Sequence, residues 1–205
     1  MHLTFHAAWV CDGGSFVADF GYWYQNGCLD PNLMMSCILA IDAADEANGC
    51  LHVLRGSHLL GRLEHGSSGD QAGADPEMVE KARGRFETVA CTLAPGDVLF
   101  THSNLVHWSR ANESDRWRRA MIFAYSAVGN GPTPGPKSDG VIPQPHPLVE
   151  VDDGTLLRIG PVGFQANSAP AAVFLDQERN KSTFKQGKDF SAEAEAFAAV
   201  ARAKL

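Results

Sequence analysis

The amino-acid sequence predicts a mainly β protein, a sandwich or barrel with a few flanking helices. Short runs of β-prone residues recur through the first 128 residues, and turn-forming residues separate them. Between these runs, residues 75–85 have a helical pattern. Many short strands with few helices are typical of sandwich and barrel folds.

Six segments are predicted to form strands because each combines β-prone residues with flanking turn signals. They are residues 2–6, 36–41, 50–54, 86–93, 98–100 and 119–125. Asn48-Gly49 precedes the third of these segments, and Pro95-Gly96-Asp97 precedes the fifth. Both are turn sequences, because glycine accepts backbone angles that other residues avoid and proline fixes its own φ.

Helical patterns mark two segments. Residues 75–85 open with Asp-Pro, carry acidic residues in the first turn and end in basic residues, which favours a helix. Residues 191–205 are rich in Ala and Glu, with Ser191 as the predicted N-cap and Lys204 near the end. Between the two, residues 129–147 are rich in Gly, Pro and Ser and are predicted to form a long loop.

We therefore divide the chain into a β-barrel core (residues 1–128), a Gly/Pro-rich loop region (129–165) and a C-terminal tail with a helix (166–205). The chain begins in or just before a core strand, so an N-terminal part of the barrel is expected to be missing. Either the sequence is a piece of a longer protein, or a partner or the tail covers the exposed strand edge.

Composition narrows the function classes. The formal net charge of −7 argues against general affinity for nucleic acid or anionic membranes, because both require a basic surface. No apolar run approaches the roughly 20 residues that span a bilayer. The five cysteines form no C-x-x-C pair, which favours buried free thiols in a reducing compartment. We expect a cytoplasmic protein, and the sequence is compatible with a homo-oligomer without determining the oligomeric state.

One segment combines a metal-ligand residue with an anion-binding residue. The strand at residues 98–100 leads to a predicted loop that holds His107-Trp108-Ser109, and Arg118 lies at the start of the strand at 119–125. Antiparallel pairing of these two strands would bring the imidazole and guanidinium groups together. Imidazole binds divalent iron, and guanidinium binds a carboxylate through two hydrogen bonds, as a metal-chelating keto acid requires. By spacing alone, a histidine near the end of a strand is more often a surface or core residue.

A carboxylate beside an aromatic cluster marks a second segment, residues 19–27. Asp19 could be a metal ligand at the mouth of a pocket that Tyr22, Trp23 and Tyr24 line. Taken alone, however, the segment is more typical of a turn residue beside aromatic side chains of the core.

These two segments belong to a longer ordered set of motifs. The set continues with Asn48-Gly49-Cys50-Leu51, Arg55-Gly56-Ser57-His58 and Leu93-Ala94-Pro95-Gly96-Asp97, and ends with an Arg eleven residues after His107. Over residues 13–125 this set resembles the phytanoyl-CoA dioxygenase family. The motifs are specific as a set, because their order and spacing both match.

The resemblance implies a double-stranded β-helix, the jelly-roll or cupin-like barrel, that binds Fe(II) through two histidines and one carboxylate. It implies 2-oxoglutarate as cosubstrate and hydroxylation of a small-molecule substrate. By position, Asp19 is the carboxylate ligand and His107 is the distal histidine ligand. Arg118, assisted by the Ser109 hydroxyl, would bind the far carboxylate of 2-oxoglutarate. Three ligands on one face leave positions open for the keto acid and oxygen.

The sequence departs from the family at one ligand. The family pattern is H-x-D, whereas this chain has Val17-Ala18-Asp19. An isopropyl group donates nothing to a metal, and even changes beside a metal ligand commonly weaken binding about ten- to a hundredfold. His2, His6, His58 or His102 could substitute for the missing ligand, whereas His52, His65 and His146 are predicted to be surface or structural residues.

Three hypotheses remain. The chain is an active Fe(II)/2-oxoglutarate hydroxylase with a substitute or solvent ligand, or a catalytically inactive relative that binds 2-oxoglutarate or another small molecule. Third, it is an incomplete piece of an active enzyme. Retention of Asp19, His107, Ser109 and Arg118 favours the first hypothesis, and Val17 favours the second.

Overall fold

The computed structural model describes residues 2–6, 16–25, 27–68, 71–131, 146–147, 150, 152 and 154. Antiparallel strands dominate this part of the chain. The large sheet has the order β10-β1-β9-β2-β7, the second sheet β6-β3-β8, and β4 pairs with β5. The strands of the large sheet are β10 (His146–Pro147), β1 (His2–His6), β9 (Ala120–Ser126), β2 (Met34–Ala40) and β7 (Val98–His102). Those of the second sheet are β6 (Thr88–Cys91), β3 (Leu51–Leu54) and β8 (His107–Ser109). The remaining pair consists of β4 (His65–Ser68) and β5 (Gln71–Ala74).

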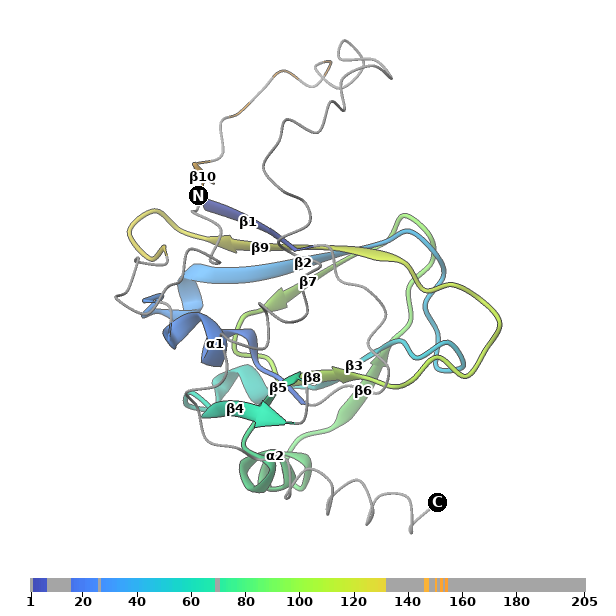
Figure 1. Cartoon of the computed structure of the whole chain (residues 1–205), viewed down its shortest axis with the longest axis horizontal. Helices are drawn as coiled ribbons and strands as arrows, with labels where there is room; N and C mark the ends of the chain where they lie inside the picture. Colours follow the sequence, from blue (N-terminus) through green and yellow to red (C-terminus); the bar gives the residue numbers. More distant parts are fainter. Residues whose placement is uncertain are drawn as a thin grey trace.

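The large sheet lies opposite the three-stranded sheet, and α1 (Asp19–Gln25) lies at one end of the space between them (Figure 1). The second helix, α2 (Pro76–Arg83), lies on the outer side of the three-stranded sheet, which is called the smaller sheet below. Two short 3-10 turns, η1 (Pro31–Leu33) and η2 (Ser57–Leu59), complete the described elements. Antiparallel sheets with few helices confirm the predicted fold class, the double-stranded β-helix.

Six of the strands, β1, β2, β3, β6, β7 and β9, confirm the six predicted segments, with ends that differ by a few residues. The helix predicted at residues 75–85 is α2, and the side chain of its N-cap, Asp75, accepts hydrogen bonds from the backbone N–H groups of Glu77 and Met78. The prediction missed α1, β4, β5 and β8. It was also wrong at the end of the loop, because His146–Pro147 pair with β1 as β10. Residues 132–145 and the predicted helix at 191–205 lie outside the described residues.

The register of the large sheet defines its inner face. Ser36 of β2 lies opposite Thr101 of β7 and Ala124 of β9, and all three side chains are buried. The adjacent row of cross-strand neighbours contains Phe100 of β7, whose side chain is 64% exposed. Because successive side chains of a strand point to opposite faces, the row with Ser36 faces the smaller sheet.

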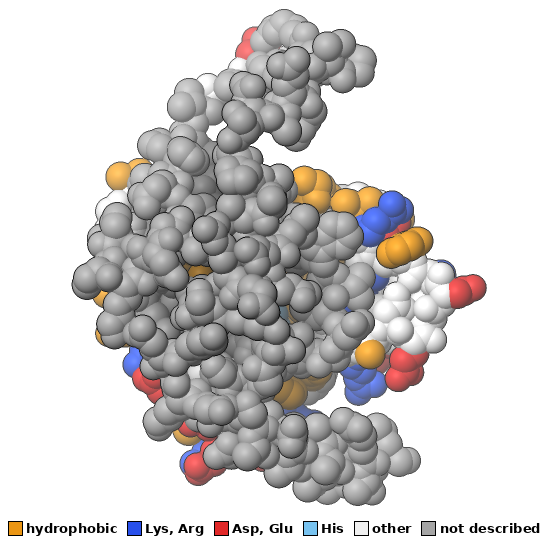
Figure 2. All heavy atoms as spheres, viewed as in Figure 1, with side chains coloured by type: hydrophobic (Ala, Val, Ile, Leu, Met, Phe, Trp, Pro, Cys, Tyr) orange, Lys and Arg blue, Asp and Glu red, His pale blue; other side chains and the backbone are white. Residues whose placement is uncertain are grey.

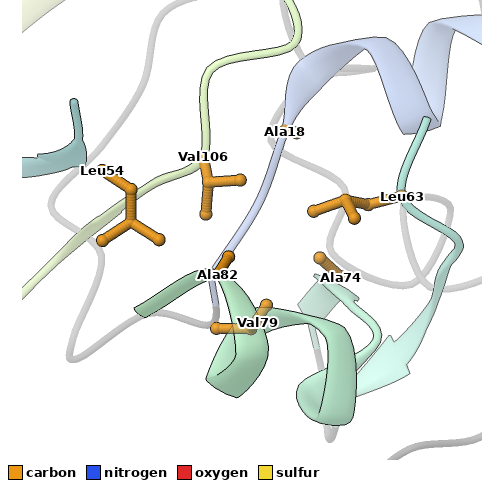
Figure 3. Packing of buried hydrophobic residues seen from close by; sticks show 7 residues of the cluster. All are labelled: Ala18, Leu54, Leu63, Ala74, Val79, Ala82 and Val106. Atoms are coloured by element: carbon orange, nitrogen blue, oxygen red, sulfur yellow. The ribbon is translucent and has the colours of Figure 1, made fainter. Parts of the chain in front are cut away.

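An apolar cluster holds α2 against the smaller sheet. Its buried members come from β3, β5, α2 and the segments that precede α1, β4 and β8, as Figure 3 shows: Ala18, Leu54, Leu63, Ala74, Val79, Ala82 and Val106. Ala18 and Val106 each immediately precede a predicted metal ligand, and both are fully buried. The cluster therefore anchors the backbone on which Asp19 and His107 are carried.

The Asn48-Gly49 motif forms the turn that leads into β3. The Asn48 side chain is buried, accepts from the backbone N–H of Asp45 and donates to the Ala43 carbonyl at 2.7 Å. Gly49 has a φ of 79°, and a side chain there would collide with the backbone carbonyl of Arg110. Both positions are thus specified by backbone geometry, which explains the motif without a chemical role.

The cysteines and helices of the described residues bear on the expectations from composition. Cys28, Cys37, Cys50 and Cys91 are free thiols, while Cys11 lies outside the described residues. Burial raises the pKa of the Cys28 thiol to about 11, so it stays protonated. None of the helices in the described ranges has the length and apolar character that crossing a bilayer requires. On the face shown in Figure 2, acidic, basic and apolar side chains of the described residues are intermingled.

Candidate functional site

Asp19 is the first residue of α1, and three backbone hydrogen bonds fix the segment around it. The N–H of Phe20 donates to the Ser103 carbonyl at 2.8 Å. Val17 forms an isolated antiparallel bridge with His107, in which each N–H donates to the other's carbonyl at 2.9 Å. The Asp19 carboxylate is therefore carried on a segment that is tied to Ser103 and to His107.

His107 is the first residue of β8, which corrects the prediction that it lies in a loop. The preceding residue, Val106, donates its N–H to the Ser57 hydroxyl at 2.9 Å, and its carbonyl accepts from Leu54. The Nδ1 atom of His107 lies 2.9 Å from the Leu105 carbonyl. A carbonyl only accepts, so Nδ1 carries the proton and, in the neutral ring, the lone pair is on Nε2.

The structure brings the two predicted metal ligands together. His107 Nε2 lies 3.7 Å from Asp19 Oδ1, and the side chains are 17% and 29% exposed. Ligand atoms of one divalent ion each lie roughly 2.0–2.2 Å from it, so two of them can be at most about 4.3 Å apart. The pair meets this condition, and the available atoms are an imidazole nitrogen and a carboxylate oxygen. These two residues therefore fit one divalent metal ion.

Arg118 and Ser109 also lie together. Arg118 Nη1 donates to Ser109 Oγ at 3.3 Å, and both side chains are partly buried. Ser109 and His107 are two residues apart on β8, so their side chains share a face of that strand. A guanidinium and a hydroxyl on the face that carries the imidazole form a suitable binding site for a carboxylate.

The route by which Arg118 reaches this face differs from the prediction. We expected the strands before His107 and after Arg118 to pair with each other. In the structure β7 and β9 both pair with β2, which lies between them, and β8 pairs with β3 in the other sheet. Arg118 therefore reaches Ser109 because the two sheets pack face to face, and not because the two strands pair with each other.

Val17 stands where the family resemblance predicts a third ligand. Residues that are directly opposite in an antiparallel bridge place their side chains on the same face, so Val17 flanks His107. Within the described part of the chain, no group of three or more His, Cys, Asp or Glu side chains could hold a metal ion. The donor set that is described therefore consists of Asp19 and His107.

The other histidines have separate environments. His58 and His102 contact each other with ring centroids 5.2 Å apart, and the ring nitrogens of His102 contact Asn32 and the N–H of Asn104. His52 is buried and stacks on Trp108 at 5.4 Å, which confirms it as structural. The side chains of His2, His6 and His146 are outside the described atoms, so their roles stay predictions.

His65 contributes more than the sequence indicated. It is 3% exposed, and its Nε2 accepts from the backbone N–H of Ala18 at 3.0 Å while Nδ1 donates to the Leu63 carbonyl at 2.9 Å. Burial lowers the pKa of this imidazole below its ordinary value, which keeps the ring neutral and able to accept. His65 thus supports the segment that carries Asp19. An E-H-G sequence alone contains no signal for this contact.

Close packing against His65 explains Gly21 in α1. A methyl group at Gly21 would overlap the imidazole ring, which is held by hydrogen bonds on both nitrogens. We predict that Gly21→Ala lowers the free energy of unfolding by roughly 1–3 kcal/mol, the usual cost of overpacking. Urea unfolding followed by circular dichroism measures this change. Gly61→Ala is the matched control, because a Cβ there meets nothing within 4 Å; equal effects in both variants would contradict the prediction.

The aromatic residues after Asp19 separate into two groups. Trp23 is buried in a cluster that packs α1 on the large sheet, and Tyr22 contacts it edge-on with centroids 5.1 Å apart. Tyr24 is 40% exposed, and the Arg62 guanidinium lies 4.4 Å from its ring centre. Core packing therefore accounts for Trp23, and a surface cation–π contact accounts for Tyr24.

Comparison with known proteins gives a family match over most of the described chain. Residues 3–120 match the model of the family described as phytanoyl-CoA dioxygenase (PhyH). A 2-aminoethylphosphonate dioxygenase from an uncultured bacterium is 30% identical over 100 residues, which are 47% of this chain and 34% of that protein. A methylphosphonate hydroxylase from Gimesia maris is 31% identical over 99 residues, 47% of this chain and 35% of that protein.

A solved structure with a similar fold is EctD from S. alaskensis with bound Fe. It has a TM-score of 0.49 and 25% sequence identity, and the match covers 64% of this chain and 44% of EctD. The chain spans about a third of the length of the two curated relatives. Fe(II) and 2-oxoglutarate are the cofactors of the matched family. With more than half of its residues matched, this chain belongs to the phytanoyl-CoA dioxygenase family.

Proposed function

We propose that the chain is the core of an Fe(II)- and 2-oxoglutarate-dependent dioxygenase that hydroxylates a small-molecule substrate. One observation carries the proposal: Asp19 Oδ1 and His107 Nε2 lie 3.7 Å apart. The hydrogen bond from His107 Nδ1 to Leu105 gives the imidazole the tautomer that a metal ligand needs. Family membership supports this interpretation over an incidental contact.

In this proposal Asp19 and His107 hold the metal. Arg118 and Ser109 bind the far carboxylate of 2-oxoglutarate and orient its keto-acid end toward the metal ligands. When bound, Fe(II) and 2-oxoglutarate would activate dioxygen, which is the oxidant: one oxygen atom oxidises 2-oxoglutarate to succinate and CO2, and the other enters a C–H bond of the substrate. Positioning is the task of the protein: two sheets place the carboxylate, imidazole and guanidinium so that both cofactors bind side by side.

The substrate is proposed only as a small molecule. The names of two relatives make 2-aminoethylphosphonate and methylphosphonate the first compounds to test. The expectations of cytoplasmic location, of no nucleic-acid or membrane partner and of a homo-oligomer remain predictions, as does the division into a core, a loop region (129–165) and a tail (166–205).

A catalytically inactive binding module is the alternative function, and Val17 favours it. With two protein ligands, the site would bind iron weakly, whereas the Arg118–Ser109 pair would still bind a dicarboxylate. Calorimetry that detects 2-oxoglutarate binding without metal, together with no succinate formation, would support this alternative. Measured turnover would eliminate it.

Anaerobic titration with Fe(II) and 2-oxoglutarate tests the main proposal. We expect a weak visible metal-to-ligand charge-transfer band, because the keto acid binds the metal through two oxygens. The band should be absent in Asp19→Ala and His107→Ala, which remove the two ligands. No band in the unmodified protein at high concentration would contradict the proposal, provided that a sharp thermal transition shows that the chain is folded.

A further inference from the structure

Ser36 makes a contact with the metal-ligand pair that the mechanism above does not use. Its hydroxyl donates a hydrogen bond to Asp19 Oδ2 at 2.7 Å. The Ser36 side chain is 4% exposed and points inward from β2, in the row that also contains Thr101 and Ala124. Ser36 therefore reaches Asp19 from the large sheet, whereas His107 reaches it from the smaller sheet.

The two oxygen atoms of the Asp19 carboxylate consequently have different partners. Oδ2 accepts from Ser36, and Oδ1 lies 3.7 Å from His107 Nε2. The backbone on either side is also held, because Ala18 donates to His65 and Phe20 donates to the Ser103 carbonyl. With the backbone fixed, the remaining freedom is rotation of the carboxylate, and the Ser36 hydroxyl opposes that rotation.

We propose that Ser36 is a positioning residue that makes Asp19 a ligand through Oδ1 alone. A carboxylate bound through both oxygens would use an additional position at the metal, which a keto acid and oxygen need. Orientation matters more in this chain than in one with three protein ligands, because Val17 donates nothing that would fix the ion. The inference rests on the proposed function, since it assigns a role at the same metal site.

Three variants separate positioning from a structural role. Ser36→Ala removes the hydroxyl, and Ser36→Thr retains it on a β-branched side chain that suits a strand. Ser103→Ala is the matched control, because Ser103 is 2% exposed and its hydroxyl donates to the Pro31 carbonyl at 3.0 Å. Thermal unfolding of all three measures how much stability each hydroxyl contributes.

The measurement is anaerobic titration with Mn(II) alone, followed by the electron paramagnetic resonance signal of the free ion. We expect Ser36→Ala to weaken Mn(II) binding roughly tenfold or more, which is the usual effect of losing a partner of a metal ligand. Ser36→Thr should stay within about threefold of the unmodified protein, and Ser103→Ala should bind as the unmodified protein does. Equal binding by Ser36→Ala and Ser103→Ala would overturn the inference while leaving the proposed function intact.

Failure of the proposed function gives a different result. If the unmodified protein binds no Mn(II), the proposed metal site is wrong, and crystal structures of the metal-free variants decide the role of Ser36. In Ser36→Ala the Asp19 carboxylate should rotate away from the orientation that it keeps in Ser103→Ala. An unchanged carboxylate would overturn the inference in that case as well.

Discussion

Replacing Val17 by histidine should strengthen metal binding by roughly a hundredfold, because the new side chain adds a direct ligand. Losing a residue that only supports a ligand already lowers metal affinity about ten- to a hundredfold, so a direct ligand should have at least the larger of these effects. The expected sign is a gain, which few substitutions in a folded protein produce. Anaerobic titration with Mn(II) or Fe(II) measures it directly. If the chain retains the rest of its site, Val17→His should also increase succinate formation from 2-oxoglutarate.

The geometry at Val17 supports this expectation. Mutual hydrogen bonds of 2.9 Å between Val17 and His107 make them directly opposite residues of an antiparallel bridge. Their side chains therefore share a face, at the spacing of cross-strand neighbours. Asp19 follows two residues later, with its Oδ1 atom toward His107. An imidazole at position 17 would thus be added beside the two proposed ligands, Asp19 and His107.

Val17→Ala is the control for this gain. It removes the same isopropyl group without providing a nitrogen, so any change that comes from space alone appears in both variants. Tighter metal binding confined to Val17→His would show that the donor is responsible. Equal binding by the two variants would mean that position 17 does not face the metal, contrary to the register of the bridge.

Replacing Arg118 by methionine should abolish most of the affinity for 2-oxoglutarate. Removing one partner of a hydrogen-bonded charge pair costs about 2–5 kcal/mol, which corresponds to a roughly thirtyfold or larger increase in Kd. Arg118→Lys should recover only part of this loss, because an ammonium group lacks the two parallel donors that match a carboxylate. Calorimetric titration with 2-oxoglutarate in the presence of Mn(II) and absence of oxygen measures the change.

A neighbouring arginine controls for loss of positive charge. Arg116 lies in the same segment but pairs with Asp45 at 2.7 Å on the surface. Arg116→Met should therefore leave the affinity for 2-oxoglutarate close to that of the unmodified protein. Equal losses in Arg116→Met and Arg118→Met would indicate a general electrostatic effect, and no loss in Arg118→Met would remove Arg118 from the binding site.

Much of the fold could be predicted because local chemistry encodes it. The Asp-Pro start of α2, the Asn48-Gly49 turn and the β-prone segments of β1, β2 and β9 depend on interactions between residues close in sequence. The strands β4, β5 and β8 and the helix α1 were missed for the converse reason. All four are short. Contacts with distant segments hold α1 and β8, as in the Val17–His107 bridge, whereas β4 and β5 pair with each other in a two-stranded sheet.

The candidate site shows the same division. The ordered motifs named Asp19, His107, Ser109 and Arg118 as a set, and the structure places them in two contacting pairs. Nothing near Ser36 or His65 in the sequence indicates that either residue touches the segment with Asp19. Both contacts join residues more than fifteen positions apart, and they exist only once the sheets have formed.

The sequence by itself determined the strand content, the turns and the family motifs, and it predicts that one ligand is missing at Val17. Tertiary structure decided which strands are neighbours, and it corrected the expected pairing of the strands before His107 and after Arg118. It also decided which oxygen of Asp19 faces the imidazole. The physical reason is the distance along the sequence over which each interaction acts. Turns and strand propensities depend on neighbouring residues. The orientation of a carboxylate depends on side chains that only the packing of two sheets brings within hydrogen-bonding distance.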